Sequence, residues 1–172
     1  MIAHYVISSI KDVEIWPLDE VKNYLRISHD YDDQLIVNLI GAATDSAELF
    51  IGINLREKQI NCKVNVATKV IRLKHLPISE INEISLIEKG EKINITSEFA
   101  DIKSNSHLLH TPDKYIGCSL DIEYKSGYLE VPRSIKQGML MHIAAMYENA
   151  EDAVILSPQI KDLYAPYRSI KI

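Results

Sequence analysis

The chain has 172 residues, of which 47% are hydrophobic and 25% charged, a composition typical of a folded globular protein and unlike that of a disordered chain. Its formal net charge of −5 argues against tight binding to nucleic acid, because clustered Lys and Arg drive such binding. No stretch approaches the roughly 18 consecutive apolar residues of a membrane span, and the opening residues lack the segments of a signal peptide. We therefore expect a cytoplasmic protein without membrane contact. Cys62 and Cys118 lie far apart in the sequence, which favours free thiols over a disulfide.

Two amphipathic helices are predicted in the first third of the chain. The stretch PLDEVKNYLRI, residues 17–27, spaces Leu18, Val21 and Leu25 at i, i+3 and i+7, which indicates a short helix. Within and after the acidic turn SHDYDD, residues 32–52 repeat this pattern over about five turns and end at a glycine suited to a helix C-cap. The small residues at 41–43 predict close approach of a neighbouring element. The apolar face expected to pack in the core comprises Leu35, Leu39, Ala42, Ala43, Ala47, Phe50 and Ile51.

The middle of the chain, residues 57–128, changes to the alternating pattern of β-strands. The stretch EKGEK predicts a hairpin turn with Gly90 at positive φ. In SLDIEYKSGYL, residues 119–129, apolar and charged residues alternate, which predicts a strand with one solvated face. The stretch SNSHLLHTPDKYIG, residues 104–117, is expected to form a loop.

The final third returns to helix at VPRSIKQGMLMHIAAMYEN, where Pro132 suits the first helical turn. The apolar stripe expected on this helix comprises Ile135, Met139, Ile143, Met146 and Tyr147. A break at Ser157-Pro158 precedes a last amphipathic run with two tyrosines. We therefore predict one α+β domain over residues 1–172 that is mainly helical. Its helix-hairpin core and C-terminal helix are expected at about 16–55 and 130–168, with a small inserted antiparallel β region at about 57–128.

No residue pattern predicts catalysis. His107 and His110 are three apart, but no third zinc ligand accompanies them, and residues 30–33 lack the glycine and glutamate of an EF-hand loop. His142 lies beside an apolar helix stripe, where packing is the expected role. Nucleotide-binding and acyl-transfer motifs are missing from the sequence, so we expect no catalytic residue, cofactor or metal site. Two alternatives stay open: a small metal-dependent enzyme using these His and Asp residues, and a monomeric binding module with its groove in the β region.

The succession PLDEVKNYLRISHDYDDQLIVNLIGAATDSAELFIGINL, then IEYKSGYLEVPRSIKQGMLMHIAAMYEN, then YAPYR resembles the head-tail connector (portal adaptor) family of tailed bacteriophages and prophages. The resemblance covers residues 16–55 and 118–168 and lies in the order of the motifs. Two positions depart from the family pattern: members often have Ser or Thr where Pro17 stands, and often Arg where Ala150 stands. The second departure removes a residue that could contact another subunit or the portal.

The resemblance implies a structural virion component that is not an enzyme, assembled in the host cytoplasm and then located at the head-tail junction. It also implies a ring of about a dozen copies of the chain. The implied partners are the portal protein, a tail-completion or stopper protein, and DNA that passes through without sequence-specific binding.

A ring subunit needs apolar or aromatic residues outside its own core, and Tyr, Trp and Arg are the types that dominate interfaces. The C-terminal run IKDLYAPYRSIKI fits this need. Two alternatives stay open: Trp16 as a hydrophobic staple on the first helix, and a tail that packs on its own domain. The expected interface residues are Trp16, Tyr147, Tyr164, Tyr167 and Arg168.

Overall fold

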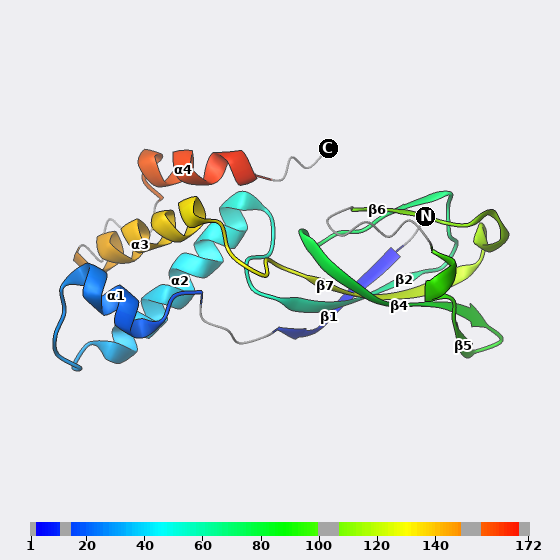
Figure 1. Ribbon diagram of the computed structural model, residues 1–172, viewed down its shortest axis with the longest axis horizontal. Helices are drawn as coiled ribbons and strands as arrows, with labels where there is room; N and C mark the ends of the chain where they lie inside the picture. The colour runs from blue at the N-terminus through cyan, green and yellow to red at the C-terminus, as the bar shows by residue number, and fades with distance from the viewer. Residues whose placement is uncertain (1–2, 11–14, 100–106, 149–155, 169–172) are drawn as a thin grey trace. The chain divides into compact units, whose positions relative to one another are not determined.

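The computed structural model describes residues 3–10, 15–99, 107–148 and 156–168 (Figure 1). The chain divides into two compact units, which we call the sheet unit (Met1–Asp12 and Arg56–Leu129) and the helical unit (Val13–Leu55 and Glu130–Ile172). The Ala150 departure and the last four residues of the predicted C-terminal arm lie outside the described residues. Among the described residues, no helix combines the length and apolar character needed to cross a membrane.

The helical unit contains α1 (Leu18–Leu25), α2 (Asp33–Ile51), α3 (Arg133–Glu148) and α4 (Pro158–Tyr164), followed by the 3-10 turn η3 (Ala165–Tyr167). Helices α1, α2 and α3 confirm the helices that the periodicity of the sequence predicted. Left-handed residues end α1 at Arg26 and α2 at Gly52, as their φ values of 59° and 78° show. Helix α4 begins where Ser157 Oγ accepts a hydrogen bond from the Ile160 amide and Pro158 occupies the first turn.

The core of the helical unit is formed mainly by α1, α2 and α3, but the predicted inner face of α2 is partly wrong. Leu35 is 47% exposed and Leu39 only partly buried, whereas Ile36 and Ile40 are buried. This helix is apolar on more than one side, so periodicity alone left two faces that could have been the inner one. The prediction for α3 holds at Ile135, Met139 and Ile143, which are buried. The buried core residues shared by the three helices are Val21, Ile36, Ile40, Ala43, Leu140 and Ile143.

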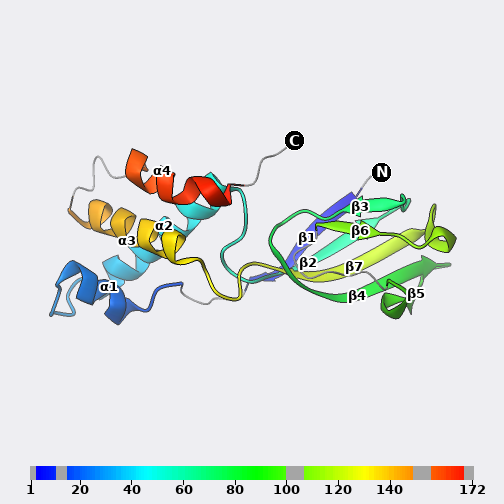
Figure 2. The same ribbon diagram turned by 45° about the horizontal axis from the view of Figure 1, so that its top comes forward.

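The sheet unit is built on a five-stranded antiparallel sheet with the order β1-β2-β7-β4-β5. These strands are β1 (Ala3–Ile10), β2 (Lys58–Val64), β4 (Ile78–Glu88), β5 (Glu91–Asn94) and β7 (Ser119–Ser126). Strands β3 (Val70–Arg72) and β6 (Leu108–His110) pair as a two-stranded ribbon, drawn together in Figure 2. Short 3-10 turns, η1 (Thr96–Glu98) and η2 (Asp113–Tyr115), complete the unit.

The hydrophobic core of the sheet unit lies between the five-stranded sheet and the β3–β6 ribbon. Ile60, Ile122 and Ile84 from the sheet belong to one buried cluster with Ile71 and Leu109 from the ribbon. Each ribbon strand buries its central residue and exposes at least one flanking residue, as the alternation of a strand requires. The ribbon therefore covers one face of the sheet, and its opposite face is exposed to solvent.

The prediction of a mainly helical domain with a small inserted β region is wrong. The structure has a five-stranded sheet with its own buried core, beside four helices. One sheet strand, β1, precedes the first helix in the sequence and was missed because most of its residues are exposed, as expected at a sheet edge. The predicted loop at 104–117 contains β6, whose three residues are too few to give a strand pattern.

Two details of the sheet bear on the sequence predictions. The β4–β5 hairpin turns at Lys89 and Gly90, both at positive φ, which confirms the predicted turn. The predicted solvated face of β7 is wrong at Asp121, which is 2% exposed because β7 is a central strand. The Asp121 carboxylate accepts a hydrogen bond from Asn61 Nδ2 at 2.7 Å and lies 2.8 Å from Lys92 Nζ, so this buried charge is paired.

Candidate functional site

All five predicted interface residues lie in the helical unit, and Trp16 is the first of them. Its indole Nε1 donates a hydrogen bond to the carbonyl oxygen of Lys136 at 3.1 Å, and the Lys136 ammonium lies 4.1 Å from the ring centroid. The ring also packs against the core shared by α1, α2 and α3. Trp16 thus anchors the segment before α1 to α3.

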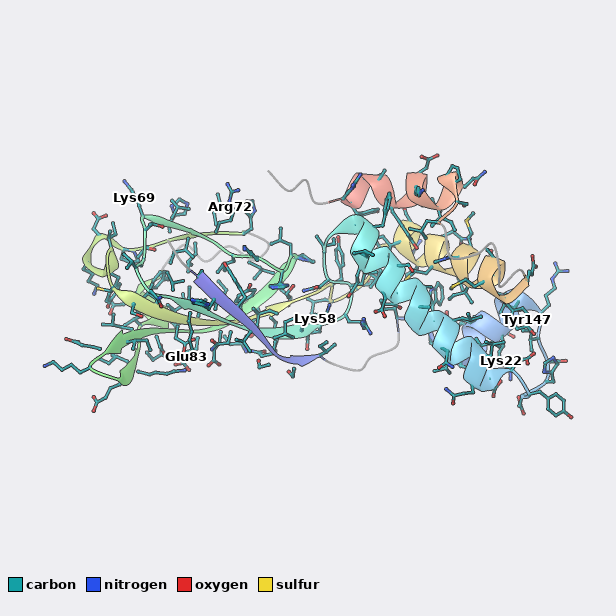
Figure 3. The ribbon with its side chains drawn as sticks, turned by 180° about the vertical axis from the view of Figure 1, so that it is seen from behind. Lys22, Lys58, Lys69, Arg72, Glu83 and Tyr147 are labelled. Carbon is teal, nitrogen blue, oxygen red and sulfur yellow. The ribbon has the colours of Figure 1, made fainter. Side chains whose placement is uncertain are left out.

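The acidic turn between α1 and α2 joins three helices. Lys22 Nζ lies 2.6 Å from both Asp30 Oδ1 and Asp33 Oδ1, and these hydrogen bonds hold the pKa of Asp30 below its usual value. Tyr147, on α3, donates a hydrogen bond from its hydroxyl to Asp32 Oδ2 at 2.7 Å, which raises the Tyr147 pKa. Figure 3 shows Lys22 and Tyr147 at the same end of this unit. The carboxylates predicted as a possible cation site are thus engaged in structural contacts.

The C-terminal segment packs partly on its own unit. Tyr164 is fully buried, its ring centroid lies 6.1 Å from that of Phe50, and burial raises its pKa. A Cβ atom built on Gly138 would lie 2.5 Å from the Tyr164 ring, so α4 approaches α3 closely through this glycine. Tyr167 is half-buried, and Arg168 is exposed with its guanidinium 5.3 Å from the Phe50 ring centroid. An interface role for these residues stays a prediction.

The histidines and cysteines form no cluster with other ligating groups. His107 and His110 are three apart beside and within strand β6, where residues at that spacing point to opposite sides. His142 is 2% exposed on α3, and Cys62 and Cys118 are free thiols. Across the described ranges, no group of three or more His, Cys, Asp or Glu side chains is arranged to hold a metal ion.

Helix α2 has an outward stripe that includes Leu35 and Ala42, two residues predicted to lie in the core, and Leu49, which was not part of that prediction. Leu35, Ala42 and Leu49 are spaced by seven residues, so they lie along one side of the helix, and all three are exposed. Leu49 is 85% exposed. Together with the partly buried Leu39, these residues form what we call the α2 outer stripe. The signal that could have found it is the presence of two apolar faces on one helix, since a helix of a monomer usually has one.

The described parts of the helical unit present structural ion pairs and an exposed apolar helix face, and such a face is typical of a surface that contacts another protein. The family model for head completion proteins matches residues 14–153, more than half of the chain. The chain belongs to the head completion protein family. This confirms the predicted resemblance to head-tail connectors.

Solved structures of gene transfer agent (GTA) particles share the fold. A chain from the neck of an empty GTA particle computed with C6 symmetry matches with a TM-score of 0.73 and 14% identity, covering 100% of this chain and 97% of the other. A chain from the virion of a native GTA particle matches with a TM-score of 0.74 and 13% identity over 98% and 96% of the two chains. A third, from the neck of a native GTA particle computed with C12 symmetry, has a TM-score of 0.60 and 13% identity over 100% and 97%. No curated protein sequence matches significantly.

Proposed function

We propose that this chain is a structural head completion protein that forms a ring at the head-tail junction of a phage or prophage particle. The observation that carries the proposal is the match of the head completion model to residues 14–153. The fold shared with neck chains of GTA particles, two of them computed with C6 and C12 symmetry, supports a ring. The role is scaffolding, without catalysis, and its partners are further copies of the chain, the portal and a tail-completion protein.

The α2 outer stripe is the surface we assign to contact with a neighbouring copy. A closed ring is built from heterologous contacts, in which one surface of each subunit meets a different surface of the next. Leu35, Ala42 and Leu49 supply exposed apolar side chains along one side of a 19-residue helix, and burying an exposed leucine contributes about 2 kcal/mol. Arg168 is exposed beside the α2 residue Phe50, and Tyr167 is half-buried next to it in the sequence. We assign both residues to the portal side of the same assembly.

Electron microscopy of the protein mixed with its own portal tests the ring. We expect a closed ring on the portal, of about a dozen copies as the resemblance to head-tail connectors implies. A protein that remains a single copy, both in solution and on portal-bearing capsids, would refute the proposal. The portal must be included because a subunit that assembles only on its template would be monomeric by itself.

Substitution of Leu49 by Asp tests the surface. We expect Leu49→Asp to leave the melting temperature within about 2 °C, because the side chain is 85% exposed, and to abolish ring formation. Leu129→Asp is the matched control, since Leu129 is 88% exposed in the sheet unit and outside the stripe. Rings that form normally with Leu49→Asp would exclude the α2 outer stripe while leaving the family role intact.

A further inference from the structure

The outer face of the β3–β6 ribbon carries positive charge only. Residues 69–75 contain Lys69, Arg72 and Lys74 and no Asp or Glu, and the facing strand with its flanks, residues 107–112, also has no acidic residue. Lys69, Arg72 and Lys74 are exposed, while the residues that alternate with them, Ile71 and Leu73, are buried. The alternation of a strand therefore directs Arg72 and Lys74 away from the core of the sheet unit.

The ribbon cations differ in their ion pairing from several other lysines of the sheet unit. Lys92, Lys114 and Lys125 form ion pairs with carboxylates of neighbouring elements. Within the described residues, neither Lys69 nor Arg72 forms such a pair. Figure 3 shows Lys69 and Arg72 on one side of this unit and Glu83 on the other.

A second observation points to a positive local potential beside the ribbon. The pKa of His75 is lowered, first by burial and then by the neighbouring charges of Lys58 and Lys74. The Lys74 ammonium also lies 5.3 Å from the ring centroid of Tyr5, which fixes one cation near the ribbon.

We propose that Lys69, Arg72 and Lys74 on the β3–β6 ribbon contact the phosphates of double-stranded DNA. Lys74 lies five positions after Lys69 in the sequence, so an extended chain places these two cations up to about 16 Å apart. A duplex carries one charge per roughly 1.7 Å of its axis, so several phosphates lie within that reach. The contact is independent of base sequence, because cations on phosphates carry no sequence information.

The contact is weak, which reconciles it with the net charge of −5. Three cations on phosphates give a slope of about −2.7 for log affinity against log salt, whereas tight binders use 6–10 such contacts. A weak contact lets a duplex move past the protein. The identity of the polyanion rests on the proposed function, because the resemblance to head-tail connectors implies that DNA passes through the ring. The charge pattern of the ribbon does not depend on it.

The test compares two triple variants of the full chain with equal net charge. Lys69→Gln, Arg72→Gln and Lys74→Gln remove the ribbon cations, and Lys63→Gln, Lys89→Gln and Arg133→Gln remove two lysines and one arginine at exposed positions elsewhere. Each variant has a formal charge of −5 − 3 = −8. Fluorescence anisotropy with two unrelated duplexes of about 30 base pairs, from about 20 to 200 mM salt, measures affinity and salt slope. Thermal unfolding checks that both variants fold.

We expect the parent to bind both duplexes equally, the ribbon variant to lose at least about tenfold in affinity at low salt, and the control variant to lose less than about threefold. Equal losses in the two variants, absence of binding by the parent, or preference for one duplex would each overturn the proposal. Ring formation on the portal is scored separately by microscopy. If the ribbon variant loses the ring but keeps DNA binding, the ribbon contacts an acidic surface of a second copy and the DNA proposal is wrong.

Discussion

Two tyrosines of the helical unit place their hydroxyl groups in opposite environments. Tyr147 donates to the Asp32 carboxylate at 2.7 Å, whereas the buried hydroxyl of Tyr164 has no hydrogen-bond partner among the described residues. A buried polar group without a partner costs about 1–3 kcal/mol, while a hydrogen bond to a charged group stabilises. The same chemical change at the two residues should therefore have opposite effects.

We expect Tyr164→Phe to leave the free energy of unfolding unchanged or to raise it by up to about 2 kcal/mol, because the ring packing is kept and the unpaired hydroxyl is removed. Tyr147→Phe should lower it by about 1 kcal/mol through loss of the bond to Asp32. Urea unfolding of both variants measures the difference. A clear loss of stability in Tyr164→Phe would show that its hydroxyl has a partner.

The ion pairs of Lys22 predict a pH dependence. The Lys22 hydrogen bond lowers the pKa of Asp30 below 3.8 in the folded state, so its stabilisation is fully present above about pH 4 and is lost as the pH falls through the folded pKa. We expect Lys22→Met to melt at a lower temperature than the parent at pH 7, and we expect this difference to shrink as the pH falls below about 4 and the Asp30 carboxylate is protonated. Lys89→Met, at an exposed turn residue, is the control. A difference that persists unchanged in acid would contradict the ion-pair account.

At the scale of elements, the bounds of α2 could be predicted from the sequence, whereas its inner face could not. The bounds and the C-cap of α2 could be predicted because a few neighbouring residues determine them. The bounds of α1 and the turn at Gly90 could be predicted for the same reason. The inner face of α2 could not be predicted from local signals, because the helix carries apolar residues on two sides about 120° apart. Only packing against the other helices selects the side with Ile36 and Ile40 as the inner one. The ribbon was missed for the same kind of reason: β3 and β6 are three residues each and pair across more than 30 residues of sequence.

The two glycines inside helices have different roles, contrary to the expectation that small residues at 41–43 admit a neighbour. No described atom lies within 4 Å of a Cβ built on Gly41, while one on Gly138 would meet the Tyr164 ring at 2.5 Å. We expect Gly41→Ala to raise stability by up to about 1 kcal/mol through helix propensity, and Gly138→Ala to lower it by about 1–3 kcal/mol through overpacking. Thermal unfolding decides. Gains at both residues would mean that α4 moves away from α3 at little cost.

At the scale of the whole molecule, formal charge is divided unequally between the two units. The helical unit has seven Lys or Arg against thirteen Asp or Glu, a net charge of −6, and the sheet unit has twelve against eleven, a net charge of +1. The sum, −6 + 1 = −5, is the net charge of the whole chain, and this net charge indicated that the protein does not bind nucleic acid tightly. Composition averages over units that the fold separates, so the cationic ribbon could not be predicted from it.

The C-terminal segment gives the prediction that separates folding from assembly. Deleting residues 164–172 removes buried Tyr164 and should lower the free energy of unfolding by about 3–5 kcal/mol, whereas deleting residues 168–172 should leave it nearly unchanged. If Arg168 and the last residues form an assembly arm, the shorter deletion also loses capture on portal-bearing capsids. Melting temperature and capsid capture measure the two effects. Normal capture by the shorter deletion would remove these residues from the interface.

The order in which the chain passes between the two units determines when each unit can fold during synthesis and whether one unit can be removed as a module. Strand β1 belongs to the sheet unit, yet its partner β2 follows only after α1 and α2, and α3 of the helical unit follows only after β7. On the ribosome, the sheet unit lacks its last strand until β7 has been made, and the helical unit is completed only by α3 and α4. For the same reason the sheet unit is not a module that gene fusion or recombination could excise: removing residues 56–129 would leave β1 behind as a strand without β2, a template for aggregation.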